Sequence, residues 1–441
     1  MKKIYILGLI FTMFTMSSCE EFLKGTNENP NDPTSVSPAA LLAPAETVIA
    51  YQYGGNFSRY SGLFVQQVEG MDRQWASFNN YVLIAANFDS DWQLLYVDVL
   101  NNLNIMIEQS ETAGYNHYIG VGKALKAFSL LLMTDFWNSI PYSNGLSGVA
   151  NLQPTFDSQA DIFTEVHKLL TEARTSLGSS DGGLALSGDL IYGGNTAAWM
   201  KATHAIQARA YLHQSLLDSN NYNNAITSID NAFSSESEDM TFDFVDGATT
   251  AGPWYQFNRD RGDIGFNSTM NTVMTNLSDP RLDKYDGDGT STFLADTDTH
   301  EYFTAGRSLP LVSYTELMFA KAEALLQSGG SQADIRTAYL AGINSSFNGM
   351  GLSADYAAYT AQDAVNPAAD LTLENIITQK WLALYTDPEA YSDWRRTGFP
   401  ALTPNNGVAI PTRFLYPQTE NQLNSNTPSV TVTDKVDWDT N

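Results

Sequence analysis

The sequence predicts a mostly α-helical protein in which helices pair into a scaffold and a large loop-rich layer lies beside it. The first observation is the recurrence of apolar residues with helical spacing. The second is the length of the polar, glycine- and proline-containing segments between the expected helices. The third is composition, because 43% apolar and 12% aromatic residues among 441 can pack a large core. Helical spacing is found in 91–110, 123–137, 161–177, 196–217, 222–233, 314–327, 335–347 and 373–385.

Two of these segments illustrate the pattern. Segment 91–110 repeats apolar residues such as Trp92, Leu95 and Val99 every three to four positions, which predicts a helix with one buried face. Segment 123–137 is apolar over most of its circumference, which predicts a helix buried on all sides.

Several expected helices form pairs that resemble tetratricopeptide units, because two helices of a dozen or more residues are joined by a short turn. Alanines such as Ala202, Ala210 and Ala322 stand where two helices must approach closely. The strict 34-residue repeat signature is not visible. We nonetheless expect the pairs to stack into a right-handed scaffold.

The segments between the helices are too long to act only as connectors. Long loops inside a compact domain are uncommon and tend to carry function. We therefore expect the connecting segments to form the ligand-binding layer. These segments are 138–157, 178–195, 236–312 and 398–441, and all are rich in Gly, Asn, Asp, Ser and Pro.

The first residues predict an exported lipoprotein. Lys2 and Lys3 precede a 13-residue apolar run that is too short to span a membrane. Two serines and then Cys19, the only cysteine, follow this run, as a lipoprotein signal peptidase requires. We expect removal of residues 1–18 and acylation of the Cys19 thiol. The alternative is an ordinary secretory peptide with a chance cysteine.

Beyond Cys19, the polar, proline-rich residues up to 45 predict a tether. Residues 46–441 are then expected to form a single domain with no disulfide, because no second cysteine is present. No later segment resembles a transmembrane helix, so the protein is expected to be anchored to a membrane through lipid and not to span it.

The charge balance excludes one class of partner. The chain has 23 basic and 49 acidic residues and a net charge of −26, and loss of residues 1–18 would remove two of the lysines. Such a surface repels phosphate backbones, so nucleic acid is not an expected partner. The same argument disfavours strongly sulfated or uronic-acid-rich ligands.

Several separate segments are informative in combination, namely KAF at 126–128, TDFWNSIPYS at 134–143, DPRL at 279–282, LVSYTELMFAKAEA at 311–324, QKWLALY at 379–385, WRRTG at 394–398 and IPTRFLYP at 410–417. Together they resemble the SusD/RagB family of nutrient-binding outer-membrane lipoproteins of Bacteroidetes. They occur in the family's order over nearly the whole chain. Glu20 and Glu21, beside the expected lipidated cysteine, also resemble the acidic tag that directs such lipoproteins to the cell surface.

This resemblance implies a tetratricopeptide-like helical fold with a loop-rich ligand face formed by an early loop and the long central excursion. It also implies a SusC-like TonB-dependent transporter as partner, over which the lipoprotein sits as a hinged lid. We interpret most of the shared residues themselves as structural. The Arg395–Arg396 pair, for example, is expected to fix the last helix against carboxylates or carbonyls of the core.

The sequence shows no arrangement of residues that indicates an enzyme. The five histidines lack metal-ligand spacing, and no nucleophile elbow, phosphate-binding loop or zinc-protease motif is present. Asp286 and Asp288 open a short acidic turn that resembles the start of a calcium loop but lacks its later glycine and closing glutamate. Calcium and a solvated acidic turn remain alternatives there, and no other cofactor is expected.

Sugar binding requires exposed aromatic faces beside planar polar groups, and two segments outside any clean helical period have both. These are 66–81 and 252–266. The alternative is that Trp75 and Trp254 anchor the loops in the core. The expected stacking residues are Trp75, Trp254 and Tyr255, with Tyr81 nearby, and the expected hydroxyl-binding residues are Arg73, Gln74, Asn258, Arg259 and Asp260.

We therefore expect a non-catalytic protein that captures a neutral oligosaccharide at the cell surface and delivers it to the transporter. A peptide-capturing lid of the same architecture is the main alternative, because peptide binding would use a longer groove and backbone hydrogen bonds. A surface glycoside hydrolase and a purely structural adhesin are the remaining alternatives.

Overall fold

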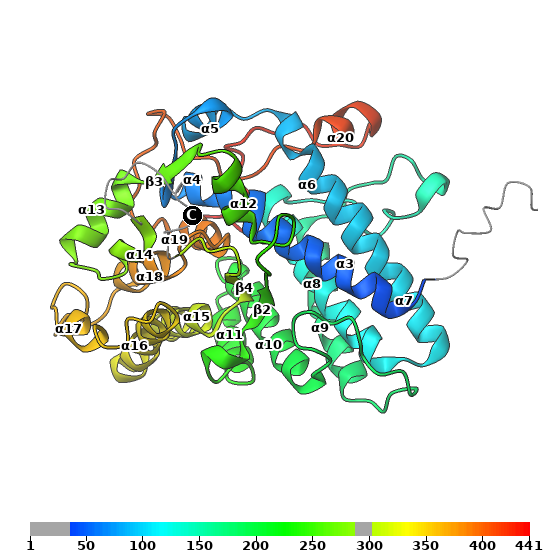
Figure 1. The fold of residues 1–441 in the computed structure, drawn as a ribbon, viewed down its shortest axis with the longest axis horizontal. Helices are drawn as coiled ribbons and strands as arrows, with labels where there is room; N and C mark the ends of the chain where they lie inside the picture. Colours follow the sequence, from blue (N-terminus) through cyan, green and yellow to red (C-terminus); the bar gives the residue numbers. More distant parts are fainter. Residues whose placement is uncertain (1–35, 287–301) are drawn as a thin grey trace, which may run out of the picture. The chain divides into compact units, whose positions relative to one another are not determined.

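Helices dominate the computed structural model, which describes residues 36–286 and 302–441 (Figure 1). Residues Pro38–Asn441 form one compact unit. The expected signal peptide, Cys19, Glu20, Glu21 and Asp288 lie outside the described residues. The long helices are α3 (Pro38–Gln52), α7 (Asn102–Ala113), α8 (Asn116–Trp137), α9 (Gln159–Leu177), α10 (Thr196–His213), α11 (Asn220–Ile229), α15 (Tyr314–Gln327), α16 (Gln332–Gly349) and α18 (Leu373–Ala383).

The long helices pack as pairs, as the apolar spacing predicted. Helix α8 packs against α9, α10 against α11, and α15 against α16. Side-chain oxygens of Ser158, Ser313 and Ser331 accept the N–H of the third residue of α9, α15 and α16 respectively, which explains where these helices begin. The mostly helical, tetratricopeptide-like fold class is confirmed. None of the helices in 36–286 and 302–441 is both long and apolar enough to cross a bilayer.

Short elements fill the space between the long helices. Helix α3 continues through the π-helical turn η1 (Tyr53–Phe57) into α4 (Ser58–Phe64), and the π-helical turn η3 (Leu95–Asn101) joins α6 to α7. The remaining elements are β1 (Val68–Gly70), α5 (Arg73–Asn79), η2 (Ala85–Phe88), α6 (Asp89–Leu94), η4 (Gly148–Ala150), η5 (Glu236–Glu238), β2 (Met240–Asp243), α12 (Pro253–Asp260), β3 (Ile264–Phe266), α13 (Ser268–Asn276), α14 (Leu282–Asp286), β4 (Ser308–Val312), α17 (Tyr356–Thr360), α19 (Glu389–Thr397) and α20 (Gln418–Leu423).

Two expectations about irregular segments are wrong in detail. The first described helix begins at Pro38, inside the segment expected to be a tether up to residue 45. Proline fits the first helical turn, and Pro44 inside α3 is tolerated because the helix packs against α7 and η3. The excursion 236–312 also contains regular structure, because β2 pairs with β4 and three short helices lie between them in the described part.

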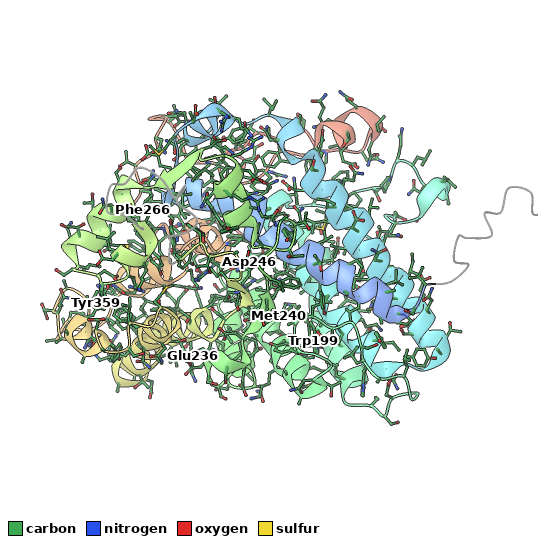
Figure 2. All side chains as sticks on the ribbon, viewed as in Figure 1. Trp199, Glu236, Met240, Asp246, Phe266 and Tyr359 are labelled. Carbon is green, nitrogen blue, oxygen red and sulfur yellow. The ribbon has the colours of Figure 1, made fainter. Side chains whose placement is uncertain are left out.

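The core is continuous through most of the molecule, and a smaller second cluster lies between α15, α16 and α18. Side chains fill the gaps between the ribbons, and the labelled Trp199, Phe266 and Tyr359 are fully buried (Figure 2). Phe414, from the C-terminal segment, packs against Phe57, Phe88 and Phe136 with ring centroids 4.4–5.5 Å apart. The C-terminal segment is therefore part of the core although it contains little regular structure.

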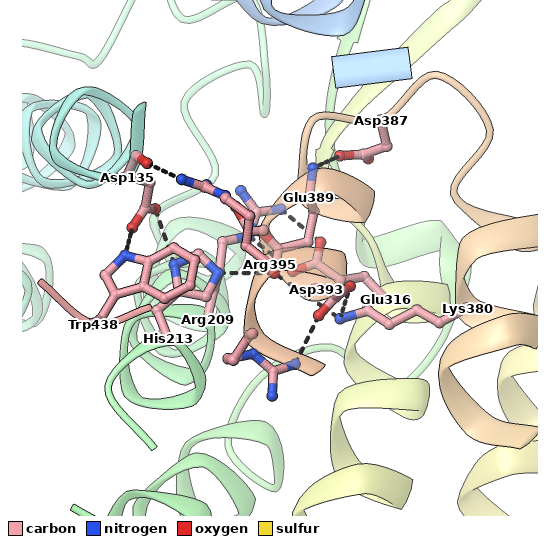
Figure 3. A network of polar contacts seen from close by, with 12 residues as sticks. Asp135, Arg209, His213, Glu316, Lys380, Asp387, Glu389, Asp393, Arg395 and Trp438 are labelled. Carbon is pink, nitrogen blue, oxygen red and sulfur yellow. Dashed lines mark hydrogen bonds and ion pairs between the residues drawn. The ribbon is translucent and has the colours of Figure 1, made fainter. Parts of the chain in front are cut away.

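A buried network of charges joins α8, α10, α15, α18, α19 and the C-terminal segment (Figure 3). The His213 imidazole lies between two carboxylates, with Nδ1 2.9 Å from Asp135 and Nε2 2.9 Å from Glu389. Arg209 makes two hydrogen bonds to the Glu316 carboxylate, of 2.8 and 2.6 Å. Buried charges are tolerated only when paired in this way.

The Arg395–Arg396 pair has the structural role that the sequence suggested. Arg395 donates to the backbone oxygens of Asp135 and Thr412, and Arg396 binds the Glu323 carboxylate. The expectation that this pair binds core carboxylates and carbonyls is confirmed, but the helix it fixes is α19, which is followed by α20.

Candidate ligand-binding site

The two segments selected for sugar binding lie side by side although nearly two hundred residues separate them. Strand β1 pairs antiparallel with β3, in a register that places Val68 opposite Phe266 and Gly70 opposite Ile264. Past the end of β1, the Met71 N–H donates to the Asp263 carbonyl at 2.8 Å. The Arg73 guanidinium also binds the buried Asp263 carboxylate. An early loop and the central excursion thus form one surface.

Glycine at position 70 makes the turn from β1 into α5 possible. A Cβ atom built on Gly70 would lie 1.9 Å from the Trp75 carbonyl oxygen, so any side chain would displace α5. The Gly70 N–H instead donates to the Asn79 side chain at 3.1 Å. This close approach sets the position of α5 against the paired strands.

Beside this surface lies a groove of about 360 Å³ between the α3–η1–α4 segment and α12. Helix α12 packs against η1. The groove is mixed in character, with aromatic, amide, carboxylate and guanidinium groups. Its lining residues are Tyr51, Gln52, Asn56, Arg59, Pro253, Gln256, Phe257, Asp260 and Arg261.

Arg59 is the central polar residue of the groove. Its guanidinium carbon lies 4.8 Å from the Phe257 ring centroid and 5.9 Å from those of Trp75 and Trp254. One terminal nitrogen donates to Asn56 Oδ1 at 2.8 Å. Its Nε has no hydrogen-bond partner among the described residues. Burial lowers the pKa of Arg59 to about 10, so it remains charged at neutral pH.

The groups around Arg59 both donate and accept hydrogen bonds. The Tyr51 hydroxyl lies 2.8 Å from the Thr249 carbonyl and accepts from the Gln256 amide at 3.0 Å. The buried Gln52 Oε1 has no partner within the part of the chain that the structure describes. Asn56 donates to Asp91 at 2.8 Å, and burial raises the pKa of this carboxyl to about 6. Such a mixture suits hydroxyl groups, which donate and accept at once.

The expectation that Trp75 and Trp254 are exposed stacking faces is wrong. Their exposed fractions are 4% and 7%. Trp75 packs against the Tyr60, Phe78 and Phe257 rings with centroids 5.3–5.5 Å apart. The Trp254 indole donates to Ser58 Oγ at 2.7 Å and stacks on Phe303 at 4.8 Å. The alternative interpretation, that both tryptophans anchor loops in the core, therefore holds.

Tyr81 and Asn258 are also buried, so they offer little surface to a ligand. Tyr81 packs against Phe64, with ring centroids 6.2 Å apart. Asn258 is 2% exposed, and neither polar atom of its amide has a partner within 36–286 and 302–441. The inward side of α12 follows helical spacing through Trp254, Phe257 and Asn258. The expectation that 252–266 lies outside any helix is therefore wrong for Pro253–Asp260, which form α12.

The other predicted residues lie near the groove in different ways. Asp260 lines it and forms an exposed ion pair with Arg259 at 2.7 Å. Gln74 is 3.4 Å from Arg261, which lines the groove, and Arg73 lies at the same rim. Tyr255 is half-buried and faces a different, larger cavity. The predicted residues therefore lie in three environments: the core, the groove with its rim, and the larger cavity.

Sequence reasoning missed Tyr51, Asn56, Arg59 and Gln256. A signal for Arg59 existed, because it is the only charged residue in the run 47–68. The glycine pair Gly54–Gly55 just before it also marks an irregular backbone, which the structure forms as the turn η1. Asp286 of the suggested calcium pair ends α14, and the described residues contain no cluster of three or more potential metal ligands.

Comparison with solved structures shows that the fold is shared. A SusD/RagB family protein from Bacteroides thetaiotaomicron superposes with a TM-score of 0.76 at 22% identity, covering 89% of this chain and 95% of that one. A chitin-binding SusD homologue from Flavobacterium johnsoniae gives 0.74 at 22% identity, covering 92% and 98%. A third structure, titled a chitin-binding protein, gives 0.75 at 23% identity, covering 92% and 100%. A search of curated proteins finds no match.

Sequence comparison with family models identifies the family itself. Residues 30–417 match the SusD-like family described as "Starch-binding associating with outer membrane". The match covers the paired helices, both segments of the candidate site and the first part of the C-terminal segment, up to residue 417. The chain therefore belongs to this SusD-like family of outer-membrane-associated binding proteins.

Proposed function

We propose that this protein captures a neutral oligosaccharide at the cell surface, without cleaving it, and delivers it to a TonB-dependent outer-membrane transporter. The groove over Arg59 is the observation that carries the proposal. It combines a charged donor held by three aromatic rings with amide, hydroxyl and carboxylate groups. These are the groups that bind sugar hydroxyls.

The charge of the protein supports a neutral ligand. The chain carries a net charge of −26, which repels polyanions. Within the groove, Arg59 and Arg261 are balanced by Asp260 and, behind the lining, by Asp91. A groove without a dominant sign of charge matches a ligand that carries none.

The revised binding residues are Arg59, Asn56, Gln256, Asp260 and Arg261, with Phe257 as the aromatic surface. Phe257 is only partly buried and lines the groove, whereas Trp75 and Trp254 support Arg59 from the core. Two solved relatives are titled as chitin-binding. Chitin oligosaccharides are therefore the first ligands to test, beside maltose- and cellulose-derived ones.

The decisive experiment is titration calorimetry of the mature protein with these oligosaccharides, comparing Arg59→Gln and Gln256→Ala with the native chain. We expect at least a tenfold loss of affinity for Arg59→Gln and a smaller loss for Gln256→Ala, because Gln256 carries no charge and is only partly buried. Arg174→Gln on α9 is the matched control and should bind normally. Unchanged affinity in both groove variants would exclude the groove as the binding site.

Titration with peptides and an assay for released reducing ends separate the alternatives. Binding of peptides in place of sugars would assign the groove to peptide capture. Release of reducing ends from a bound oligosaccharide would indicate a hydrolase and contradict the proposed non-catalytic role.

Anchoring and delivery need a cellular test. We propose that Cys19 carries the lipid and that Glu20 and Glu21 direct the protein to the outer surface. Cys19→Ser should release the protein from the membrane fraction, and gentle detergent extraction of the native protein should recover a TonB-dependent transporter with it. Recovery without any transporter would contradict the delivery step.

A further inference from the structure

A second and larger cavity, of about 520 Å³, lies on the other side of α12 from the groove. Its walls come from β2, β4, the start of α15, the end of α16 and the segment that joins α18 to α19. Thr304, Ser308 and Gly349 line it and are exposed, so the cavity opens to solvent. Its volume lies within the range of about 300–1,000 Å³ that is typical of small-molecule sites.

Helix α12 separates the two hollows. Pro253 lines both, whereas Trp254 and Tyr255 line only the cavity and Gln256 and Phe257 line only the groove. Strand β4 can pack closely against η1 because residue 54 is a glycine. A Cβ atom at this position would lie 2.7 Å from a Leu309 methyl group. A ligand in the groove therefore does not occupy the cavity.

The walls of the cavity differ in chemistry. One wall is aromatic, where Trp254 stacks on Phe303 at 4.8 Å and Phe303 lies 5.8 Å from Tyr385. The opposite wall is rich in hydroxyls, and Thr315 and Ser345 share a hydrogen bond of 2.8 Å. The Tyr385 side chain is 2% exposed, and its hydroxyl has no partner among the residues whose positions are described.

Charged groups complete the lining. The Asp239 carboxyl accepts the Tyr314 N–H at 2.6 Å, and the Asp387 carboxyl accepts the Tyr53 hydroxyl at 2.6 Å. Burial raises the pKa of both carboxyls to about 7. Arg307 lies over the Tyr302 ring, 3.6 Å from its centroid.

We propose that this cavity is a second binding site for a neutral, polyhydroxylated ligand of one or two sugar rings. The half-buried Tyr255 ring, which lines the cavity, contacts the C–H face of a sugar ring, and the hydroxyls and carboxyls of the lining bind the ring hydroxyls. A purely apolar ligand would leave these polar groups unpaired. An anionic ligand is disfavoured, because the lining contains three acidic residues, Glu236, Asp239 and Asp387, and one arginine, Arg307.

The ligand class rests in part on the proposed function, but the site does not. The cavity shares only Pro253 with the groove and draws its hydroxyl wall from α15 and α16. Loss of groove binding therefore leaves cavity binding intact, and the two hypotheses fail independently.

The test uses calorimetric titration with four neutral disaccharides, namely diacetylchitobiose, maltose, cellobiose and mannobiose. Gly349→Trp places an indole at the cavity mouth, where a Cβ atom would meet nothing within 4 Å. Thr241→Trp narrows the cavity from β2 in case the first variant fails to fold. Asn344→Trp, on the exposed side of the same helix and outside the cavity lining, is the matched control.

We expect Arg59→Gln to retain binding of at least one disaccharide at the cavity. We expect Gly349→Trp and Thr241→Trp to lower the affinity of the cavity for that disaccharide at least tenfold. Asn344→Trp should retain the native affinity of the cavity, and Gly349→Trp should retain the native affinity of the groove for the disaccharide. The proposal is overturned if Arg59→Gln binds none of the four sugars, or if both tryptophan variants in the cavity bind as the native chain does. Loss of affinity in Asn344→Trp would equally contradict it.

Discussion

Arg59 keeps its positive charge away from bulk water because aromatic rings and oxygen acceptors replace the water around it. The rings of Phe257, Trp75 and Trp254 lie 4.8–5.9 Å from the guanidinium carbon. Nearby Asp91 partly offsets the cost of burial. The two tryptophans expected to touch the ligand thus lie behind Arg59, the residue that we propose contacts the ligand, and hold it in place.

Replacing Trp75 tests this supporting role. Trp75→Ala should lower the free energy of unfolding by about 3–5 kcal/mol, because a large buried ring is removed. It should also weaken oligosaccharide binding, because Arg59 loses one of its three rings. Urea denaturation and calorimetry measure the two effects. Tyr255→Ala, one residue from Trp254 but half-buried, is the control and should cost much less stability; equal losses would contradict the packing described here.

His213 makes stability depend on pH. Its imidazole lies between Asp135 and Glu389, and although burial opposes the charge, these carboxylates raise the pKa of His213 to about 9. The charged imidazole therefore stabilises the fold below the unfolded pKa of about 6.5, and this contribution is lost as pH rises through 9.

We expect the free energy of unfolding to fall by up to about 3 kcal/mol between pH 6.5 and 9 through this residue. His213→Gln should be less stable at pH 6.5, and the gap between it and the native chain should shrink towards pH 9. Urea denaturation at several pH values measures this gap. A gap that stays constant with pH would show that His213 is not charged in the folded protein.

At the scale of elements, the turn between β1 and α5 shows how one residue positions a site. Gly70→Ala would place a Cβ atom 1.9 Å from the Trp75 carbonyl, so α5 must move. We expect a loss of more than about 1–3 kcal/mol, the usual cost of overpacking, because the clash is with backbone. Gly349→Ala, whose Cβ meets nothing within 4 Å, should change the melting temperature little. Similar melting curves for the two variants would contradict the close approach.

Helix α12 shows why the buried residues of a short helix are hard to predict from the sequence. Its eight residues form two faces. Trp254, Phe257 and Asn258 lie on the inward face, and Arg259 and Asp260 lie on the outward face. Isolated helices of this length are not stable, so contacts with η1 decide that the segment is helical. Residue type alone therefore could not separate the buried aromatics from the exposed ones.

At the scale of the whole molecule, the C-terminal segment joins distant parts of the core. The Trp438 indole donates to Asp135 at 2.9 Å, and its backbone N–H donates to Gln159 at 2.8 Å. The Arg395 guanidinium lies 4.6 Å from its ring centroid. These contacts connect residue 438 to α8, α9 and α19.

Truncation tests this connection. Removing residues 436–441 deletes a buried tryptophan and leaves Asp135 with one fewer donor, so we expect a loss of about 3–5 kcal/mol and a clear fall in melting temperature. Removing only Thr440 and Asn441, which are exposed, should have little effect. Thermal unfolding followed by circular dichroism compares the two. Equal melting temperatures would show that the segment does not contribute to the core.

The sequence by itself determined most of the long helices, though not α3, and it indicated their pairing and the family. Helical spacing of apolar residues and short motifs can be recognised from neighbouring residues alone. It also directed attention to 66–81 and 252–266, which do lie together. Only the tertiary structure decided that Trp75 and Trp254 face inward, that Arg59 faces the groove and that β2 pairs with β4. Burial and strand pairing depend on partners up to two hundred residues away, and no local pattern records which partner a side chain will meet.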